Sequence, residues 1–419
     1  MRNRIAILGG GPGGYVAAVR AAQLGAEVTL IEKEALGGTC LNRGCIPSKI
    51  FQTTAGILNR FRRCQEFGIQ VEGTPRVDMP ALLARKEKVV STQVRGIESL
   101  LKHNGVAHVK GTGTFKTYGS MNVLTADGDT LRIGWDTLII STGSEPLEIP
   151  AFPFDGESVI SSTDALNLDA VPESMVIVGG GVIGCEFACI LADLGTRVTV
   201  VEALDRLLPL PSVDAGCSKV LQREMKKKKI TFLLNRTVTA VDTSNGSALV
   251  SIGPSPFAEN IKAKDLSPMQ IETDKVLVSI GRRSNAKGIG LENLGLETDN
   301  KGWIAADDRL RTPVENVFAI GDALGPEKVM LAHVASAEGV IAAENALGGD
   351  RKMNYDAVPG AIYTLPEVAD VGLTEHQARE KGLDVRADAV LFRTIGKAQV
   401  IGELAGEATV SYTHLTLPT

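Results

Sequence analysis

The sequence lacks any apolar run of about 18 residues, the length typical of a membrane-spanning helix. It also lacks a block of basic residues, and its formal net charge is -5, so neither nucleic-acid binding nor attachment to a membrane surface is expected as its main work. Its 6 cysteines are too scattered for a disulfide framework. The chain enters an apolar run at Ile5 without a leader-like segment, and a cytoplasmic location is therefore expected.

An internal repeat organises the chain, which has 419 residues and 44% apolar content, enough for two or three domains. Residues 4–34 align with residues 174–204 at a constant offset of 170. Each copy has an apolar β-branched run, a Gly-x-Gly-x-x-Gly loop, an amphipathic helical stretch, a glycine turn and a second strand that ends in Glu. The pattern predicts two βαβ units. The loop residues and the acidic residue are Gly9, Gly11, Gly14 and Glu32 in the first copy, and Gly179, Gly181, Gly184 and Glu202 in the second.

The chemistry of dinucleotide binding accounts for these residue types. The first glycine permits a tight turn, the second lets the backbone approach a pyrophosphate, and the third lets the helix pack on the strand. The helix N-terminus then faces the pyrophosphate, and the acidic residue accepts a hydrogen bond from a ribose hydroxyl. One such loop is a weak signal, but two in the same strand-helix-strand context predict two nucleotide cofactors. A carboxylate at Glu202 would repel a 2′-phosphate, which favours NAD over NADP.

A pair of cysteines follows the first βαβ unit directly. Cys40 and Cys45 are close enough in sequence to form a small-loop disulfide if the start of a helix is distorted there, and Pro47 is one expected cause of that distortion. A metal site would need more ligands, and residues 36–63 contain no other Cys or His. A pair of inert buried thiols would not explain the glycines and the proline that flank them. In the cytoplasm such a pair is more often catalytic than structural.

Residues 37–49 read Gly-Gly-Thr-Cys-Leu-Asn-Arg-Gly-Cys-Ile-Pro-Ser-Lys. This segment resembles the active-site signature of the dihydrolipoamide dehydrogenases, within the class I pyridine nucleotide-disulfide oxidoreductases that also include glutathione and mercuric reductases. Leu41 and Ile46 stand where those other relatives usually have Val, which favours the lipoamide branch. The resemblance covers residues 4–409. It implies an α/β fold with two Rossmann-like FAD- and NAD-binding domains and a partial C-terminal α+β dimerisation domain.

The resemblance also implies roles for individual residues. Cys40 would be the interchange thiol that meets the substrate, and Cys45 would face the flavin. Lys49 would lie near the reactive nitrogen of the flavin and pair with Glu186. Asp322 would bond the ribityl chain, although a helix N-cap is an alternative role for it. The further positions expected near FAD are Gly113, Thr142, Gly143 and Ala332, and those expected near NAD are Val238 and Gly281.

The same resemblance divides the chain into expected domains. They are a first FAD-binding part (1–148), an NAD-binding domain (149–272), a second FAD-binding or central part (273–347) and a shortened dimerisation domain (348–409). Members of this family end in a His-Pro-Thr-x-x-Glu stretch whose histidine serves the partner subunit, whereas this sequence contains no His-Pro dipeptide. Residues 410–419 match no part of the family and, when back-translated, resemble a sequencing-library adapter. We therefore expect them to be a non-native tail.

The function that the resemblance implies is oxidation of a protein-bound dihydrolipoyl group, with electrons passing through Cys40 and Cys45 and FAD to NAD. The expected partners are the lipoyl domains of acyltransferases or of glycine-cleavage H-type proteins, and a second copy of the chain in the complete enzyme. Two alternatives stay open. One is an NAD(P)H-dependent reductase of a small disulfide or of mercuric ion, and the other is a flavin-binding fragment without turnover.

Overall fold

The computed structural model describes residues 3–244, 246–258 and 267–414, and the chain forms two compact units. The first unit comprises Met1–Ser48, Ala84–Leu147 and Gly281–Tyr355. The second comprises Lys49–Leu83, Glu148–Ile280 and Asp356–Thr419. Among the described residues, no helix has both the length and the apolar character required to cross a membrane.

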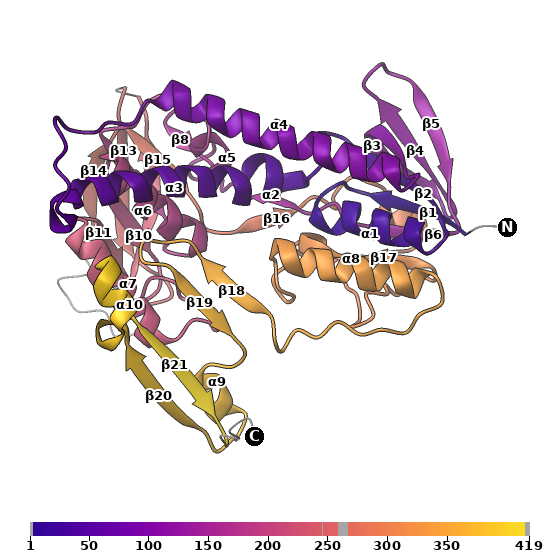
Figure 1. The fold of residues 1–419 in the computed structure, drawn as a ribbon. Helices are drawn as coiled ribbons and strands as arrows, with labels where there is room; N and C mark the ends of the chain where they lie inside the picture. The colour runs from indigo at the N-terminus through magenta and orange to yellow at the C-terminus, as the bar shows by residue number, and fades with distance from the viewer. Residues whose placement is uncertain (1–2, 245, 259–266, 415–419) are drawn as a thin grey trace. The chain divides into compact units, whose positions relative to one another are not determined.

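A seven-stranded sheet forms the centre of the first unit (Figure 1). Its order is β17 (Val317–Ala319), β6 (Thr137–Ile140), β1 (Arg4–Leu8), β2 (Glu27–Glu32), β3 (Ala107–Thr117), β4 (Ser120–Thr125) and β5 (Thr130–Gly134). The strands from β17 to β3 pair in parallel, and β3, β4 and β5 pair antiparallel. Strands β1, β6 and β17 are almost continuously apolar and buried because both faces of the sheet are covered.

Two helices of the first unit, α1 (Pro12–Gln23) and α8 (Ala332–Ala346), pack directly against each other and lie side by side in Figure 1. A side chain at Gly339 of α8 would overlap the carbonyl oxygen of Gly13 in α1. The two backbones therefore approach more closely than any residue larger than glycine at position 339 would allow. This contact fixes the start of α1, which carries the first glycine loop.

The second unit contains a five-stranded parallel sheet. Its order is β11 (Thr231–Leu234), β10 (Arg197–Glu202), β9 (Ser174–Val178), β15 (Lys275–Val278) and β8 (Val159–Ile160). The short helix α5 (Ser162–Ala165) follows β8, α6 (Val182–Leu194) joins β9 to β10, and α7 (Ala215–Lys227) precedes β11. An antiparallel sheet of β12 (Arg236–Asp242), β13 (Ala248–Pro254) and β14 (Met269–Thr273) belongs to the same unit. The predicted repeat is confirmed, because β1-α1-β2 and β9-α6-β10 are both strand-helix-strand units with parallel strands.

The unit boundaries differ from the expected domains at three main places, one of which is 348–355, expected in the dimerisation domain but part of the first unit. The expected boundary at 272/273 falls inside the second unit, because β15 pairs with β9 and β8 of its parallel sheet, and the chain enters the first unit only at Gly281. Residues 49–83, expected in the first FAD-binding part, belong to the second unit. The reason is packing: Phe51 and Ala55 of α3 (Cys45–Arg62) are buried in the same core as Ile177 of β9.

The C-terminal part of the second unit begins with a hairpin of β18 (Pro359–Ile362) and β19 (Val368–Val371), followed by α9 (Glu375–Glu380). A second hairpin pairs β20 (Arg386–Leu391) with β21 (Glu407–Tyr412), with η5 (Phe392–Thr394) and α10 (Gly396–Ile401) between its strands. Residues 410–412 of the expected non-native tail lie within β21, whereas 415–419 lie outside the described residues. The expectation that the tail begins at residue 410 and matches no part of the family is wrong for residues 410–413, which a family comparison below includes in its match. The origin of the residues after 413 stays a prediction.

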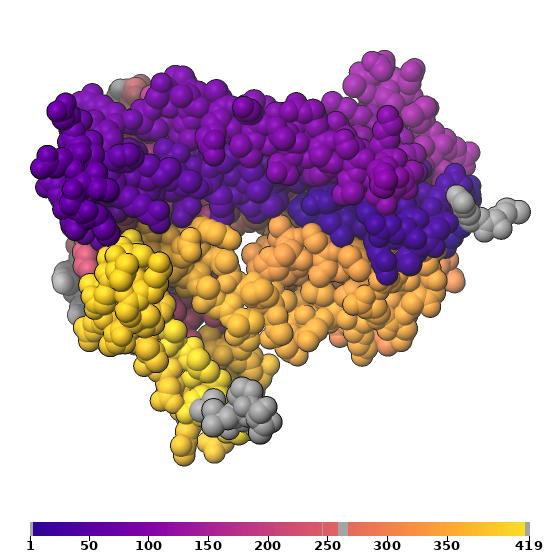
Figure 2. Space-filling view, in the orientation of Figure 1, coloured from indigo at the N-terminus to yellow at the C-terminus, as the bar shows by residue number. Residues whose placement is uncertain are grey.

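This C-terminal segment, drawn in yellow in Figure 2, exposes many apolar side chains. Val400 is 73% exposed, Val410 is 56% exposed and Val390 is 53% exposed. Apolar exposure concentrated in one segment is typical of a surface that another protein covers.

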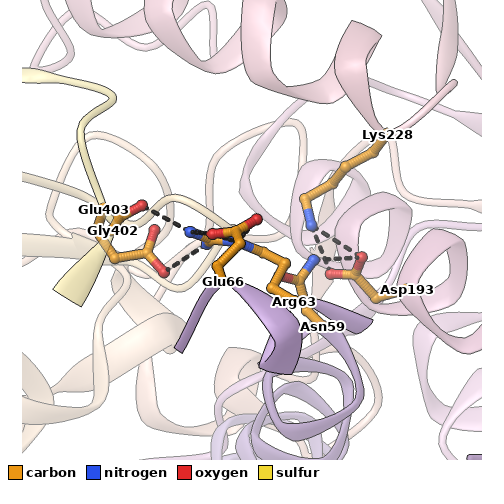
Figure 3. A network of polar contacts seen from close by, with 7 residues as sticks. All are labelled: Asn59, Arg63, Glu66, Asp193, Lys228, Gly402 and Glu403. Atoms are coloured by element: carbon orange, nitrogen blue, oxygen red, sulfur yellow. Dashed lines mark hydrogen bonds and ion pairs between the residues drawn. The ribbon is translucent and has the colours of Figure 1, made fainter. Parts of the chain in front are cut away.

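A polar network fixes the end of α3 within the second unit (Figure 3). Asp193 of α6 is only 3% exposed, and its carboxylate accepts hydrogen bonds from Lys228 Nζ at 2.7 Å and from Asn59 Nδ2 at 3.2 Å. Beyond the end of the helix, the guanidinium of Arg63 donates to the carbonyl oxygen of Gly402 at 2.9 Å. The network therefore joins α3 to α6, to the end of α7 and to the loop after α10.

We expect Lys228→Met to lower the free energy of unfolding by about 3 kcal/mol, because it removes the cation nearest to the buried Asp193 carboxylate and leaves Arg62 at 4.0 Å. The adjacent Lys227→Met is the matched control. The Lys227 side chain is 65% exposed and pairs with Glu224. Loss of its charge should therefore lower the free energy of unfolding by less than about 1 kcal/mol. Urea unfolding followed by circular dichroism measures both values. Equal losses in the two variants would contradict the role given to Asp193.

Candidate active site

The first and third glycines of each loop are required by the packing of the protein itself. Gly9 has a φ of 109°, and a Cβ there would overlap the carbonyl oxygen of Ser141. A Cβ at Gly14 would overlap the carbonyl oxygen of Gly9. Gly179 and Gly184 repeat the arrangement, with a φ of 103° at Gly179. The turn and the close start of the helix thus exclude any larger residue at these four positions.

The middle glycines are different, because the packing of the protein does not require them. A Cβ at Gly181 would meet no protein atom within 4 Å, and one at Gly11 would meet only the Cα of Gly38 at 3.8 Å. Each is the N-cap residue of its helix, and neither helix start is capped by a side-chain hydrogen bond. Open space beside uncapped N–H groups fits the pyrophosphate of a dinucleotide.

The two acidic residues occupy equivalent positions at the ends of β2 and β10. Glu32 Oε2 accepts a hydrogen bond from the N–H of Gly10 at 2.7 Å, and Glu202 Oε2 accepts one from the N–H of Gly180 at 2.5 Å. The other oxygen of Glu202 accepts from the N–H of Leu204 at 2.8 Å. These bonds hold each carboxylate beside its glycine loop, and each oxygen has a second lone pair for a ribose hydroxyl. The binding of a ribose by Glu32 and Glu202 remains a prediction.

Alanine substitutions in the second loop separate packing from binding. Gly184→Ala should destabilise the second unit because its Cβ overlaps a backbone carbonyl, whereas Gly181→Ala should fold normally. Gly181→Ala should nevertheless weaken NADH binding by about tenfold or more, equivalent to about 1.4 kcal/mol, because its methyl group enters the open space. Calorimetric titration and thermal melting measure the two effects. Unchanged NADH affinity in a folded Gly181→Ala protein would exclude this loop as the binding site.

A second polar cluster lies in the first unit at the ends of β6 and β17. Ser144 Oγ donates to Asp322 Oδ2 at 2.6 Å and accepts from Arg282 Nε at 2.6 Å, and Arg282 Nε lies 3.6 Å from the same carboxylate oxygen. Asp322 is not the N-cap of its short helix η4 (Gly321–Leu324), because that position is Ile320. The hydroxyl of Thr142 is buried and has no hydrogen-bond partner, and Gly143 has a φ of 69°. A buried hydroxyl without a partner, two residues before the serine that fixes this carboxylate, fits a polar ligand such as a ribityl chain.

Four other positions expected to contact a cofactor lie outside the glycine loops and the Ser144, Asp322 and Arg282 cluster. Gly113 lies within β3, where a Cβ would be 2.6 Å from Cδ1 of Leu8, so close packing already explains this glycine. Ala332 is the first residue of α8. The side chain of Val238 is 6% exposed and belongs to the core beneath the antiparallel sheet, which leaves only its backbone for a ligand. Gly281 lies in the first unit, with a φ of 141°, and its carbonyl accepts from the N–H of Leu147. Their cofactor contacts stay predictions.

The two cysteines lie on consecutive helices. Cys40 is half-buried in α2 (Gly38–Arg43), and Cys45 is the exposed first residue of α3. The break between the helices is at Gly44, with φ -145° and ψ -112°, and not at Pro47 as the sequence analysis expected. Pro47 lies in the first turn of α3, where a proline removes no helical hydrogen bond. The distortion at the cysteine pair therefore comes from the glycine.

Charged and polar groups surround the cysteines in the first unit. Burial lowers the pKa of Arg282, and the negative charges of Asp322 and then of Cys45 oppose that shift. Burial raises the pKa of Tyr15 in α1, with a further contribution from Cys40. A buried guanidinium close to Cys45 would stabilise the thiolate form of that residue, which is the reactive form of a cysteine.

The expected ion pair between Lys49 and Glu186 is confirmed. Lys49 Nζ lies 3.0 Å from Oε1 and 2.9 Å from Oε2 of Glu186. Glu186 is 7% exposed, in the first turns of α6, and Lys49 is in the first turns of α3. Both residues belong to the second unit. Their catalytic role stays a prediction.

A buried acid that was not predicted from the sequence shapes the turn of Asp322. Glu338 of α8 is 1% exposed, its Oε2 accepts from the N–H of Gly321 at 2.6 Å, and its Oε1 accepts from the hydroxyl of Tyr355 at 2.7 Å. Burial raises the pKa of Glu338. The available signal was an acid in the middle of a helix whose residues are mostly small or apolar. Its partners, however, cannot be read from the sequence.

The pKa of Glu338 is raised in the folded state, so ionisation of this acid above pH 4.5 lowers the free energy of unfolding. A neutral side chain at this position would avoid that loss. We therefore expect Glu338→Gln to gain stability relative to the wild type as the pH rises from 4 to 8. Urea unfolding at several pH values gives the difference directly. Glu344→Gln is the control with the opposite sign, since Arg351 and Arg20 lower the pKa of that half-buried acid. A Glu338→Gln protein that loses relative stability with rising pH would contradict the assignment.

Comparisons with known proteins agree with this arrangement. The sequence model of the family described as pyridine nucleotide-disulphide oxidoreductase matches residues 3–339, and the model of its dimerisation domain matches residues 358–413. The dihydrolipoyl dehydrogenase of Chlamydia muridarum is 40% identical over 406 residues, which are 96% of this chain and 83% of the relative. That of Bacillus subtilis is 40% identical over 407 residues, which are 97% of this chain and 85% of the relative.

Two solved structures are similar in fold. The crystal structure of LpdA from Mycobacterium tuberculosis gives a TM-score of 0.88 at 28% identity, over 98% of this chain and 86% of that chain. The HOCl-induced flavoprotein disulfide reductase RclA from Escherichia coli gives a TM-score of 0.81 at 27% identity, over 97% of this chain and 86% of that chain.

Proposed function

The chain belongs to the pyridine nucleotide-disulphide oxidoreductase family, and from this premise we propose that it oxidises a protein-bound dihydrolipoyl group with NAD as the final electron acceptor. The observation that carries the proposal is the Cys40 and Cys45 segment directly after the first of two nucleotide-binding βαβ units. Relatives that share this organisation over nearly the whole chain are named dihydrolipoyl dehydrogenase. The family uses FAD and NAD(H). FAD, when bound, carries the electron pair between the cysteines and the nicotinamide.

The two cysteines perform the thiol exchange. One thiolate of the substrate attacks the Sγ of Cys40 in a Cys40–Cys45 disulfide, forming a mixed disulfide and releasing the Cys45 thiolate. The second substrate thiolate attacks the substrate sulfur of the mixed disulfide, so that the lipoyl disulfide leaves and Cys40 becomes a thiolate. The substrate dithiol is thereby oxidised, and the cysteine pair is reduced by the same two electrons. The guanidinium of Arg282 interacts electrostatically with Cys45 and thereby stabilises the released thiolate.

The base that removes the substrate protons is assigned to no residue of this chain. Such a base is required because only the thiolate attacks a disulfide. Relatives of this class use a histidine in a His-Pro-Thr-x-x-Glu stretch, and none of the 5 histidines printed here is followed by proline.

The nicotinamide nucleotide is NAD in this proposal because Glu202 lies beside the second glycine loop. Its carboxylate is held by the N–H groups of Gly180 and Leu204 and is 6% exposed. A 2′-phosphate at that position would face an unneutralised negative charge. NADPH-dependent reduction of a small disulfide or of mercuric ion is therefore the less favoured alternative.

The match of residues 358–413 to the dimerisation domain supports assembly as a homodimer, and the exposed apolar side chains of this segment agree with it. Lipoyl domains of acyltransferases or of glycine-cleavage H-type proteins are the proposed substrates. The cytoplasmic location stays a prediction from the sequence.

Anaerobic half-reactions test the proposal without requiring turnover. Dihydrolipoamide should change the flavin absorbance of the wild-type protein, whereas Cys40→Ser and Cys45→Ser should show no change because the exchange cannot start. NADH should still reduce the flavin in both variants, since that transfer does not involve the cysteines. Cys217→Ser, a half-buried cysteine of α7, is the control and should behave as wild type. A dithiol response that survives in Cys40→Ser, or reduction by NADPH in preference to NADH, would overturn the proposal.

A further inference from the structure

An aromatic ring lies against the ammonium group of Lys49, the ion-pair partner of Glu186. Lys49 Nζ lies 4.2 Å from the ring centroid of Tyr363, well within the range of a cation–π contact. The backbone N–H of Tyr363 also donates to Glu186 Oε1 at 2.9 Å. The ammonium, the carboxylate and the tyrosine thus form one closed cluster within the second unit.

The backbone around Tyr363 is fixed by contacts of its own. Ile362 and Val368 are buried in the same core as α6. The N–H of Leu365 donates a hydrogen bond to the thiol of Cys189. Burial raises the pKa of this thiol to about 12. Cys189 and Glu186 are one turn apart on α6, so two acceptors on one face of that helix hold the segment 363–365. The position of the ring is therefore set by the backbone.

Burial of the ring does not explain its position. Tyr363 is 37% exposed, whereas Glu186, which accepts its backbone N–H, is 7% exposed. A lysine has a flexible four-carbon stem and a compact charge, and its ammonium can leave a partner by simple rotation. The ring therefore gives the Lys49 ammonium, on a side chain that is 30% exposed, a second contact besides Glu186.

We propose that Tyr363 is a positioning residue whose ring holds the Lys49 ammonium against Glu186. It lies in the region that matches the dimerisation domain, whereas Lys49 and Glu186 lie in the region that matches the oxidoreductase family. The contact therefore ties the C-terminal region to the charge pair of the redox domain. The proposal rests on the proposed function only where it links Lys49 to electron transfer.

Substitutions at position 363 isolate the ring, because the bond to Glu186 comes from the backbone and survives any change of side chain other than proline. Tyr363→Phe keeps the aromatic face, and Tyr363→Leu removes it while keeping apolar bulk. Tyr363→Gln removes it with a polar side chain, in case the leucine variant does not fold. Phe232→Leu is the matched control, since Lys226 Nζ lies 5.2 Å from the Phe232 ring in a contact remote in sequence from Lys49.

The experiment is competitive acylation of lysines with acetic anhydride on the full chain with bound flavin, read by mass spectrometry. Lys49 should be acylated about three- to tenfold faster in Tyr363→Leu or Tyr363→Gln, because these variants lose the cation–π contact. In Tyr363→Phe, which keeps that contact, Lys49 should be acylated near the wild-type rate. Phe232→Leu should leave Lys49 unchanged. Equal Lys49 rates in the wild type and the leucine and glutamine variants, or an equal rise in Tyr363→Phe, would overturn the proposal.

A second readout addresses electron transfer. Stopped-flow reduction of the flavin by NADH should slow in Tyr363→Leu at an unchanged KM for NADH and recover in Tyr363→Phe. A wild-type protein that fails to react with dihydrolipoamide would remove the proposed function and leave the acylation result standing. An unchanged reduction rate in Tyr363→Leu alongside faster acylation would remove the link of Lys49 to electron transfer.

Discussion

The contact between the third and first glycines of each loop is the constraint on which both nucleotide folds depend. Because the helix starts against the carbonyl oxygen of Gly9 or Gly179, its first N–H groups lie directly at the end of the central strand. The middle glycine is then left beside open space, and the carboxylate at the end of the next strand bonds to the loop. The arrangement that fits a dinucleotide thus follows from one close backbone contact made twice.

Buried carboxylates hold other backbone segments of the site in place. Each of them is neutralised or hydrogen-bonded in a different way. Glu202 accepts two backbone N–H groups, Glu186 accepts a lysine and one N–H, and Glu338 accepts an N–H and a tyrosine hydroxyl. A buried carboxylate without such partners would be strongly destabilising. Each of these acids therefore fixes a segment of backbone at a place where a cofactor is expected, and the cost of burying it is offset by the contacts that define the site.

The C-terminal region contributes to the same charge pair. Tyr363 follows β18 directly, and both its ring and its N–H contact the Lys49 and Glu186 pair. A segment whose family match concerns subunit assembly is thereby in direct contact with residues of the redox domain. Changes in that segment would therefore reach the Lys49 and Glu186 pair through both the ring and the backbone N–H of Tyr363.

The sequence by itself determined the two βαβ units, because their glycine spacing and apolar periodicity are local properties of the chain. It also identified the cysteine pair, and the family resemblance predicted that Lys49 meets Glu186. Only the tertiary structure located the helix break at Gly44, since the conformation of a glycine is set by its neighbours in space. The contacts of Tyr363 with Lys49 and of Tyr355 with Glu338 were equally hidden, because neither pair has a short sequence period that would reveal it. Local periodicity fixes which elements form, whereas packing between distant segments decides which side chains meet.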